Sequence, residues 1–239
     1  MRYLIVGLAR NIAHCWEQTN SSLQKIQAAC GDDCRTLIVE SNSSDGTGEI
    51  LKAWGGHPNR FVLSLGDLTE SVRTKRIAHC RNAYMDFFES RGLFDSHDYM
   101  LVVDLDTSLA IEDDFKSQLD SCFVRDDWDA IASNRRGRYY DIWALRSEQI
   151  GCTFDCWEMA KRCGDEHKYI RRFQTKICPK LAWIPCTSAF GCMALYKTKV
   201  IRGRWYNGDQ TCEHVSFHEG HRMFINPGFI SGGECLEHL

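Results

Sequence analysis

The chain has 239 residues, a formal net charge of −3, 44% apolar residues and 26% charged residues. This length suits one α/β domain with a single sizeable core, or at most two small domains. The slightly negative charge argues against a nucleic-acid-binding protein, which needs a basic stripe on its surface. No segment approaches the roughly 20 apolar residues of a membrane-spanning helix, so no membrane span is expected.

The first 106 residues alternate between predicted strands and predicted helices. Continuous β-branched runs predict buried strands, and apolar residues at helical spacing predict the helices between them. In chain order these are a strand within 2–11, a helix over 16–29, a strand and a helix within 34–54, a strand over 60–65, a helix over 71–92 and a strand over 99–106. The alternation predicts a mainly parallel sheet with helices on both faces. In such sheets ligands bind beyond the carboxyl ends of the strands.

The pattern changes after residue 125. Residues 129–134 and 139–146 flank a glycine-containing turn and predict a β-hairpin. The remaining predicted elements are a helix over 155–163 and strands within 189–201 and 223–231. The chain shows no internal repeat, low-complexity tract or linker. We therefore expect one α/β domain, with a mainly parallel sheet flanked by helices and a smaller antiparallel part.

The 13 cysteines are an odd number and lack the pattern of a small secreted domain. Several lie in apolar runs, so reduced and buried thiols are expected. One group within residues 152–167 has the spacing C-x3-C-x6-C-x3-H, which in principle suits zinc. That segment also has the pattern of an amphipathic helix followed by a turn, and we favour the helix over the zinc site.

Residues 100–109, MLVVDLDTSL, run from a hydrophobic strand directly into two acids. Asp104 and Asp106 lie on the same face of an extended backbone, where two like charges repel each other unless a cation lies between them. Hard cations such as Mg²⁺ and Mn²⁺ prefer carboxylate oxygen. The alternative is a turn in which Asp106 with Thr107 or Ser108 caps the next segment. We favour the metal site, because the strand delivers both acids to the expected edge of the sheet.

Five segments carry motifs that recur together in one family. They are VESNSSDGTGEIL (39–51), AHCRNAYMDF (78–87), LVVDLD (101–106), FGCMALYKTKVI (190–201) and CEHVSFH (212–218). In order and spacing they resemble the GT-A glycosyltransferases, most nearly the large inverting family that includes the cellulose, chitin and hyaluronan synthases. The resemblance spans about residues 3–230, and its D-x-D motif is the metal-binding motif of that family.

The resemblance implies a metal-dependent enzyme that transfers a sugar from a nucleoside diphosphate to a carbohydrate acceptor, with inversion. UDP is expected over GDP, Mn²⁺ or Mg²⁺ would bridge the two phosphates, and the products would belong to polysaccharide or glycan biosynthesis. It further implies a single GT-A catalytic domain, Rossmann-like, over residues 1–239. Residues 1–125 would bind the nucleotide sugar, and residues 126–239 would bind the acceptor and carry the catalytic group.

The resemblance also implies roles for single residues on the donor side. Asp106 is expected to bind the metal directly, whereas Asp104 binds the metal or reaches the ribose through water. Asp45 either contacts the base or caps the helix that follows it. Among the arginines, Arg76 and then Arg81 are favoured for the phosphates, because a guanidinium fork suits phosphate oxygens. The expected nucleotide-sugar-binding residues are Ala9, Arg10, Glu40, Asn42, Asp45, Arg76, Arg81, Asp104 and Leu105.

An inverting transferase needs a base that deprotonates the acceptor hydroxyl. Glu213 falls on the family's acid and is the expected base, while His214 replaces the aspartate that follows and is a candidate to share the proton. The alternative is that Glu213 only opens a helix, whose N-terminus favours an acid. Enzymes of this fold often add a histidine from the C-terminal part to the metal. We expect His218 in this role, over His214, His221 and His238.

Residues 133–146 are expected to form the acceptor side, where aromatic rings stack on sugars and polar groups bind hydroxyls. The expected acceptor-binding residues are Arg135, Tyr139, Tyr140, Asp141 and Trp143. The alternative is that every second residue of this segment belongs to the core. The loop over residues 204–210 contains a glycine and could close over the donor or the acceptor.

Two other functions stay open from the sequence. A sugar-1-phosphate nucleotidyltransferase would need a glycine-rich phosphate loop after the first strand, where residues 6–15 contain one glycine. A non-catalytic carbohydrate-binding module of the same fold would be expected to lose Asp106 or Glu213, and both are present. Because residues 1–11 lack the features of a signal peptide, we expect a cytoplasmic enzyme, of bacterial or viral origin rather than from the Golgi. Oligomeric state and further domains are not predicted.

Overall fold

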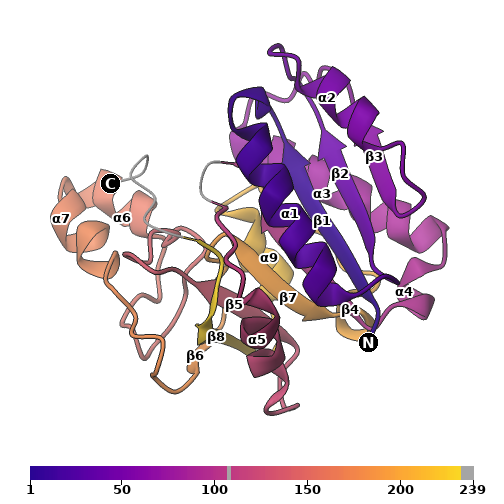
Figure 1. The fold of residues 1–239 in the computed structure, drawn as a ribbon. Helices are drawn as coiled ribbons and strands as arrows, with labels where there is room; N and C mark the ends of the chain where they lie inside the picture. The colour runs from indigo at the N-terminus through magenta and orange to yellow at the C-terminus, as the bar shows by residue number, and fades with distance from the viewer. Residues whose placement is uncertain (107–108, 233–239) are drawn as a thin grey trace.

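An eight-stranded sheet runs through the computed structural model, which describes residues 1–106 and 109–232 (Figure 1). Its strands are β1 (Tyr3–Ala9), β2 (Arg35–Glu40), β3 (Arg60–Ser64), β4 (Tyr99–Asp104), β5 (Ala130–Asn134), β6 (Ile184–Cys186), β7 (Met193–Lys197) and β8 (Met223–Ile230). The α-helices are α1 (Trp16–Cys30), α2 (Thr47–Trp54), α3 (Arg73–Ser90), α4 (Leu93–Ser96), α5 (Phe115–Asp120), α6 (Cys156–Cys163), α7 (Glu166–Tyr169), α8 (Thr198–Ile201) and α9 (Glu213–His218). Short 3₁₀ turns are η1 (Ala13–Cys15), η2 (Ser121–Phe123) and η3 (Arg171–Phe173).

The strand order is β3-β2-β1-β4-β7-β5-β8-β6. The first four strands are parallel, and their register pairs Ala9 with Glu40 and Leu8 with Asp104. The polar ends of three strands therefore meet at one edge of the sheet. Strand β7 lies antiparallel between β4 and β5, and β8 is parallel to β5 but antiparallel to β6. The predicted mainly parallel sheet with a smaller antiparallel part is confirmed.

Alternate residues of the central strands belong to two different hydrophobic clusters, one on each face of the sheet. Val6 lies in a cluster with Tyr84 and Phe88 of α3, whereas Ile5 lies in a cluster with Ile26 of α1. Figure 1 accordingly shows α1 and α3 on opposite sides of β1 and β2. Burial on both faces explains why these strands are apolar without interruption. Over the described residues, no helix is both long enough and apolar enough to cross a membrane.

The predicted hairpin is wrong. Strand β5 forms as expected, but residues 139–146 form no strand beside it. The reason is topological, since β7 and β8 already occupy both edges of β5 and leave no free edge for a hairpin partner. Residues 138–146 instead form a loop that makes two isolated bridges, Arg138 with Lys176 and Arg146 with Ser188.

The segment proposed as an alternative zinc site is a helix, as expected. The carboxylate of Asp155 accepts hydrogen bonds from the backbone N–H groups of Trp157 and Glu158, which fixes the start of α6. Cys152 and Cys156 are buried, and their thiols donate to backbone carbonyls. The cysteines of the described residues are free thiols, and these residues contain no cluster of three metal-binding side chains.

Gly191 offers a test of how tightly β7 is joined to β5. Its φ is +69°, and a Cβ at this position would lie 2.2 Å from the carbonyl oxygen of Ser133. We expect Gly191→Ala to lower the free energy of unfolding by roughly 3 kcal/mol or more, from the φ penalty and the clash together. Gly151 is the matched control, because its φ is +78° but a Cβ there meets nothing within 4 Å. Gly151→Ala should lower the free energy of unfolding by about 1–2 kcal/mol. Urea denaturation measures both variants, and equal losses would contradict the close contact.

Candidate active site

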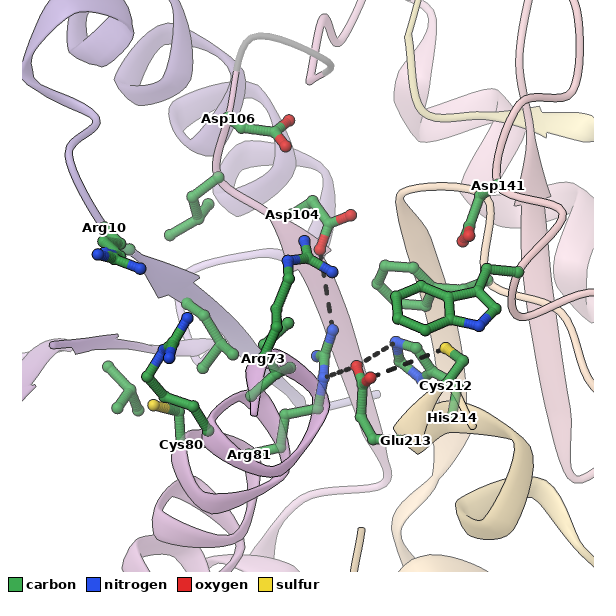
Figure 2. A pocket seen from close by; sticks show the side chains of 18 of the residues that line it. Arg10, Arg73, Cys80, Arg81, Asp104, Asp106, Asp141, Cys212, Glu213 and His214 are labelled. Atoms are coloured by element: carbon green, nitrogen blue, oxygen red, sulfur yellow. Dashed lines mark hydrogen bonds and ion pairs between the residues drawn. The ribbon is translucent and has the colours of Figure 1, made fainter. Parts of the chain in front are cut away.

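A cavity of about 720 Å³ opens at the sheet edge where β1, β2 and β4 end (Figure 2). This volume is in the range of small-molecule binding sites. Its walls come from the strand ends, from α3 and α9, and from residues 140–143. The predicted site residues that line it are Ala9, Arg10, Arg76, Arg81, Asp104, Leu105, Asp106, Tyr140, Asp141, Trp143 and Glu213. The cavity thus brings together residues that are more than 200 positions apart, such as Ala9 and Glu213.

The two aspartates of the D-x-D motif lie at the mouth of this cavity. Asp104 is the last residue of β4 and its side chain is 33% exposed, whereas Asp106 is exposed. The intervening Leu105 is buried in the core. Burial, and next the neighbouring charge of Asp106, raise the pKa of Asp104 well above its usual value. Thr107 and Ser108, which the alternative turn requires, lie outside the described residues.

A buried ion pair joins α3 to α9 beneath the aspartates. The Nε of Arg81 donates to the Oε1 of Glu213 at 2.9 Å, and both side chains are only 5% exposed. The same guanidinium places Nη2 at 3.9 Å from Oδ1 of Asp104. Arg81 therefore connects the predicted base to the predicted metal site, as the dashed lines in Figure 2 show. The other carboxylate oxygen of Glu213 accepts from the thiol of Cys212 at 3.7 Å.

His214 lies next to this pair on the floor of the cavity. Its ring stacks on Phe190 at a centroid distance of 4.1 Å, and its Nε2 is 3.7 Å from Oε1 of Glu213. Neither ring nitrogen has a hydrogen-bond partner within residues 1–106 and 109–232. Burial, followed by the charge of Arg81 and by His218, lowers the pKa of His214 well below its usual value, so the ring is neutral at pH 7.

Three residues predicted on the donor side hold the strand-end loops and do not line the cavity. Glu40 accepts from the backbone N–H of Ser43 and from the hydroxyl of Ser64. The amide of Asn42 exchanges hydrogen bonds with the backbone of Leu68. Asp45 accepts from the hydroxyl and the N–H of Thr47 and from the N–H of Ala13, in accord with the helix-capping alternative.

The predicted acceptor side divides in the same way. Tyr140, Asp141 and Trp143 line the cavity, whereas Arg135 and Tyr139 are buried in the core, as the alternative for this segment anticipated. Asp141 accepts from the backbone N–H of Gly191 at 3.1 Å, and burial raises its pKa. Figure 2 shows Asp141 on the opposite side of the cavity from Asp104. The indole N–H of Trp143 donates to Asp155 at 3.1 Å, which fixes the ring against the cap of α6.

The position of His218 argues against its predicted role as a metal ligand. The ring is fully buried and is absent from the cavity wall. Its Nδ1 shares a hydrogen bond with the hydroxyl of Ser188 at 3.0 Å, and its Nε2 shares one with the hydroxyl of Tyr196 at 2.8 Å. Both nitrogens are thus engaged inside the core. Of the other histidines considered, His238 lies outside the described residues.

Several cavity residues were not assigned a role from the sequence. Phe190, Cys212 and Gln174 line the wall, and so does Trp157, which is exposed on α6. Phe190 and Cys212 lie within two of the motif segments, so the sequence offered a reason to expect them near the site. The pattern of residues 152–167 predicts a helix but not where that helix packs, so Trp157 gave no signal at all. Arg73 also lines the cavity, with its guanidinium 6.0 Å from the ring of Trp143.

Replacing Arg81, the positively charged member of the buried pair, should destabilise the fold strongly. We expect Arg81→Met to lower the free energy of unfolding by about 3–5 kcal/mol, because Glu213 would stay buried without a partner. The double variant Arg81→Met/Glu213→Leu should recover a large part of this loss, since an apolar pair leaves no unpaired charge. Urea denaturation of wild type and the variants measures both. A double variant as unstable as Arg81→Met would contradict the pairing.

Comparison with known proteins places this fold. No protein-family profile and no curated protein matches the sequence. Among solved structures, the mannosyltransferase PcManGT from Pyrobaculum calidifontis, in complex with GDP-Man and Mn²⁺, matches with a TM-score of 0.58 at 15% identity, over 97% of this chain and 56% of that one. TarS 1-349 from S. aureus, in complex with UDP-GlcNAc, matches with a TM-score of 0.53 at 13% identity, over 100% of this chain and 60% of that one.

These similarities concern architecture, because the identities are low and the chain spans less than two thirds of either structure. Both matches nevertheless extend over nearly the whole chain, from the parallel strands to the antiparallel part. They agree with the resemblance that the five motifs indicate. The chain has the GT-A fold of the nucleotide-sugar glycosyltransferases.

Proposed function

We propose that the chain is a divalent-metal-dependent glycosyltransferase that uses a nucleoside-diphosphate sugar, with UDP favoured over GDP. The observation that carries the proposal is the acid pair Asp104 and Asp106 at the mouth of a cavity of about 720 Å³. A second set of ionisable groups lies deeper, with Glu213 and His214 on the floor and Asp141 on the far wall. Of the solved structures named above, one is a mannosyltransferase with GDP-Man and Mn²⁺ and the other holds UDP-GlcNAc, which supports this assignment.

The residues at the cavity mouth suit a hard divalent cation. The raised pKa of Asp104 has burial as its main cause and the charge of Asp106 as the next, and a cation between the carboxylates would relieve the second. Two carboxylates leave room for diphosphate oxygens and water in the coordination sphere, as Mg²⁺ and Mn²⁺ require. When bound, the cation would neutralise the diphosphate and stabilise it as a leaving group.

The charges lining the cavity fit a diphosphate together with such a cation. Four arginines and four acids line it, so their formal charges balance. Arg10, Arg73 and Arg76 line the cavity, where their guanidinium groups can bind phosphate oxygens. Arg81 is committed to Glu213, so we assign it to organising the site rather than to direct phosphate binding.

The far side of the cavity suits a carbohydrate acceptor. Tyr140, Trp143 and Trp157 offer aromatic faces, which pack on the apolar C–H faces of sugars. Asp141 is oriented by the N–H of Gly191 and can accept from a hydroxyl. We retain Glu213 as the base, oriented by Arg81 at Oε1 and able to take a proton at Oε2, which accepts from the weak donor Cys212. Attack from the side opposite the diphosphate gives inversion.

Nucleotide binding tests the metal site directly. Isothermal titration calorimetry with UDP and with GDP, in Mn²⁺ and in EDTA, should show binding of one nucleotide that weakens at least about tenfold without metal, or roughly 1.4 kcal/mol. Asp106→Asn should lose the metal dependence. Asp113→Asn is the matched control, because Asp113 is an exposed acid paired with Lys25 outside the cavity. Nucleotide binding that is insensitive to both EDTA and Asp106→Asn would contradict the proposal.

The proposed base can be tested once a donor is known. Glu213→Gln keeps the shape and one hydrogen bond to Arg81 but cannot take a proton at neutral pH. We expect the turnover number to fall by about 10²–10⁴-fold while the affinity for the nucleotide stays within a factor of about two, because Glu213 does not touch the nucleotide. Release of the nucleotide in the presence of donor and Mn²⁺ measures turnover. If Asp141→Asn abolished turnover and Glu213→Gln did not, the base would be Asp141.

A further inference from the structure

We propose that His214 is a specificity residue whose ring nitrogens hydrogen-bond a hydroxyl of the transferred sugar. This inference rests on the proposed function and adds a residue that selects among sugars. Its starting point is the imidazole itself, which is 3% exposed and lines the cavity, with neither nitrogen hydrogen-bonded within the described residues. An unsatisfied polar group in such a place is destabilising, and a bound hydroxyl would supply the missing partner.

The ring is held in place, so the missing partners do not reflect a loose side chain. It stacks on Phe190, with a centroid distance of 4.1 Å and an interplanar angle of 22°. His218 stacks on it at 5.4 Å, and Tyr206 meets it edge-on at 5.8 Å. Aromatic contacts thus orient the ring without using its nitrogens. A hydroxyl that binds there finds a preorganised partner.

The position of the His214 ring indicates that its ligand is the transferred sugar and not the acceptor. A chain of contacts leads from Asp104 to Arg81 at 3.9 Å, from Arg81 to Glu213 at 2.9 Å and from Glu213 to His214 at 3.7 Å. The sugar of the donor is bonded directly to the diphosphate, which Asp104 and Asp106 are proposed to hold through the metal. It must therefore lie next to this chain of contacts, while the acceptor enters from the side of Asp141.

The surroundings of His214 favour a neutral hydrogen-bonding role over a role as base. Arg81 of α3 lies on the other side of Glu213, and His218 stacks on the ring from the same helix. Burial and both of these neighbours disfavour the imidazolium form. A neutral imidazole offers one N–H donor and one acceptor nitrogen. A site built around a substrate hydroxyl rejects analogues that lack it far more strongly than a purely apolar site can.

His214→Phe is the sharpest variant, because it keeps an aromatic ring on Phe190 and removes only the two nitrogens. Release of the nucleotide from UDP-glucose, UDP-galactose, UDP-GlcNAc, UDP-xylose and GDP-mannose in Mn²⁺ gives kcat/KM for each donor without an identified acceptor. For the donor that wild type prefers, we expect His214→Phe to lower kcat/KM by about 10–150-fold, and the ratio to the next donor should shrink by a similar factor. The affinity for the free nucleotide should not change.

Two further measurements distinguish a loss of sugar recognition from a loss of folding stability. His214→Phe should unfold at the same or a higher urea concentration than wild type, since an unsatisfied polar group has been removed. His214→Gln restores a donor and an acceptor and should recover part of the lost discrimination. An equal fall of kcat/KM for every donor, or unchanged ratios, would overturn the assignment. If wild type turned over no donor and bound no nucleotide with metal, the proposed function would fail, which is a different outcome.

Discussion

The buried pair between Arg81 and Glu213 is the interaction on which the site depends. It joins residues 132 positions apart, one on the long helix α3 and one at the start of α9. Two ions 5% exposed are costly to desolvate and are stable only in close contact. Since Arg81 also reaches toward Asp104, a single guanidinium sets the distance between the acid pair at the mouth of the cavity and the cavity floor.

The parallel part of the fold was predictable because each strand carries its own signal. Strands β1, β2 and β4 are buried on both faces, so each contains an apolar run, and the helices between them show helical spacing. The segment 139–146 has similar residue types but no free strand beside it, since β5 already has two neighbours. Strand pairing of this kind is a long-range property, and local residue patterns contain no information about it.

The candidate site was predictable where a motif fixes the chemistry of a side chain. Asp104 and Asp106 follow a buried strand, and that position alone brings them to the ligand-binding edge. Glu40 ends β2 and Asn42 follows it at the same edge of the sheet, yet their side chains turn back to hold loops. Whether a polar residue faces a ligand or the backbone depends on loop geometry. A sequence pattern therefore predicts which edge of the sheet binds a ligand. It is less informative about which side chains at that edge face the ligand.

Strand β7 has a consequence for any attempt to divide the molecule. It comes from the second half of the chain but forms hydrogen bonds along the whole of β4, and the carbonyl of Cys192 accepts from the N–H of Asp104 itself. A fragment that stopped near residue 125 would leave β4 as an open edge made of buried, apolar residues. Such edges pair readily with other chains. Expression of residues 1–125 alone would thus yield a self-associating fragment, with Asp104 no longer anchored.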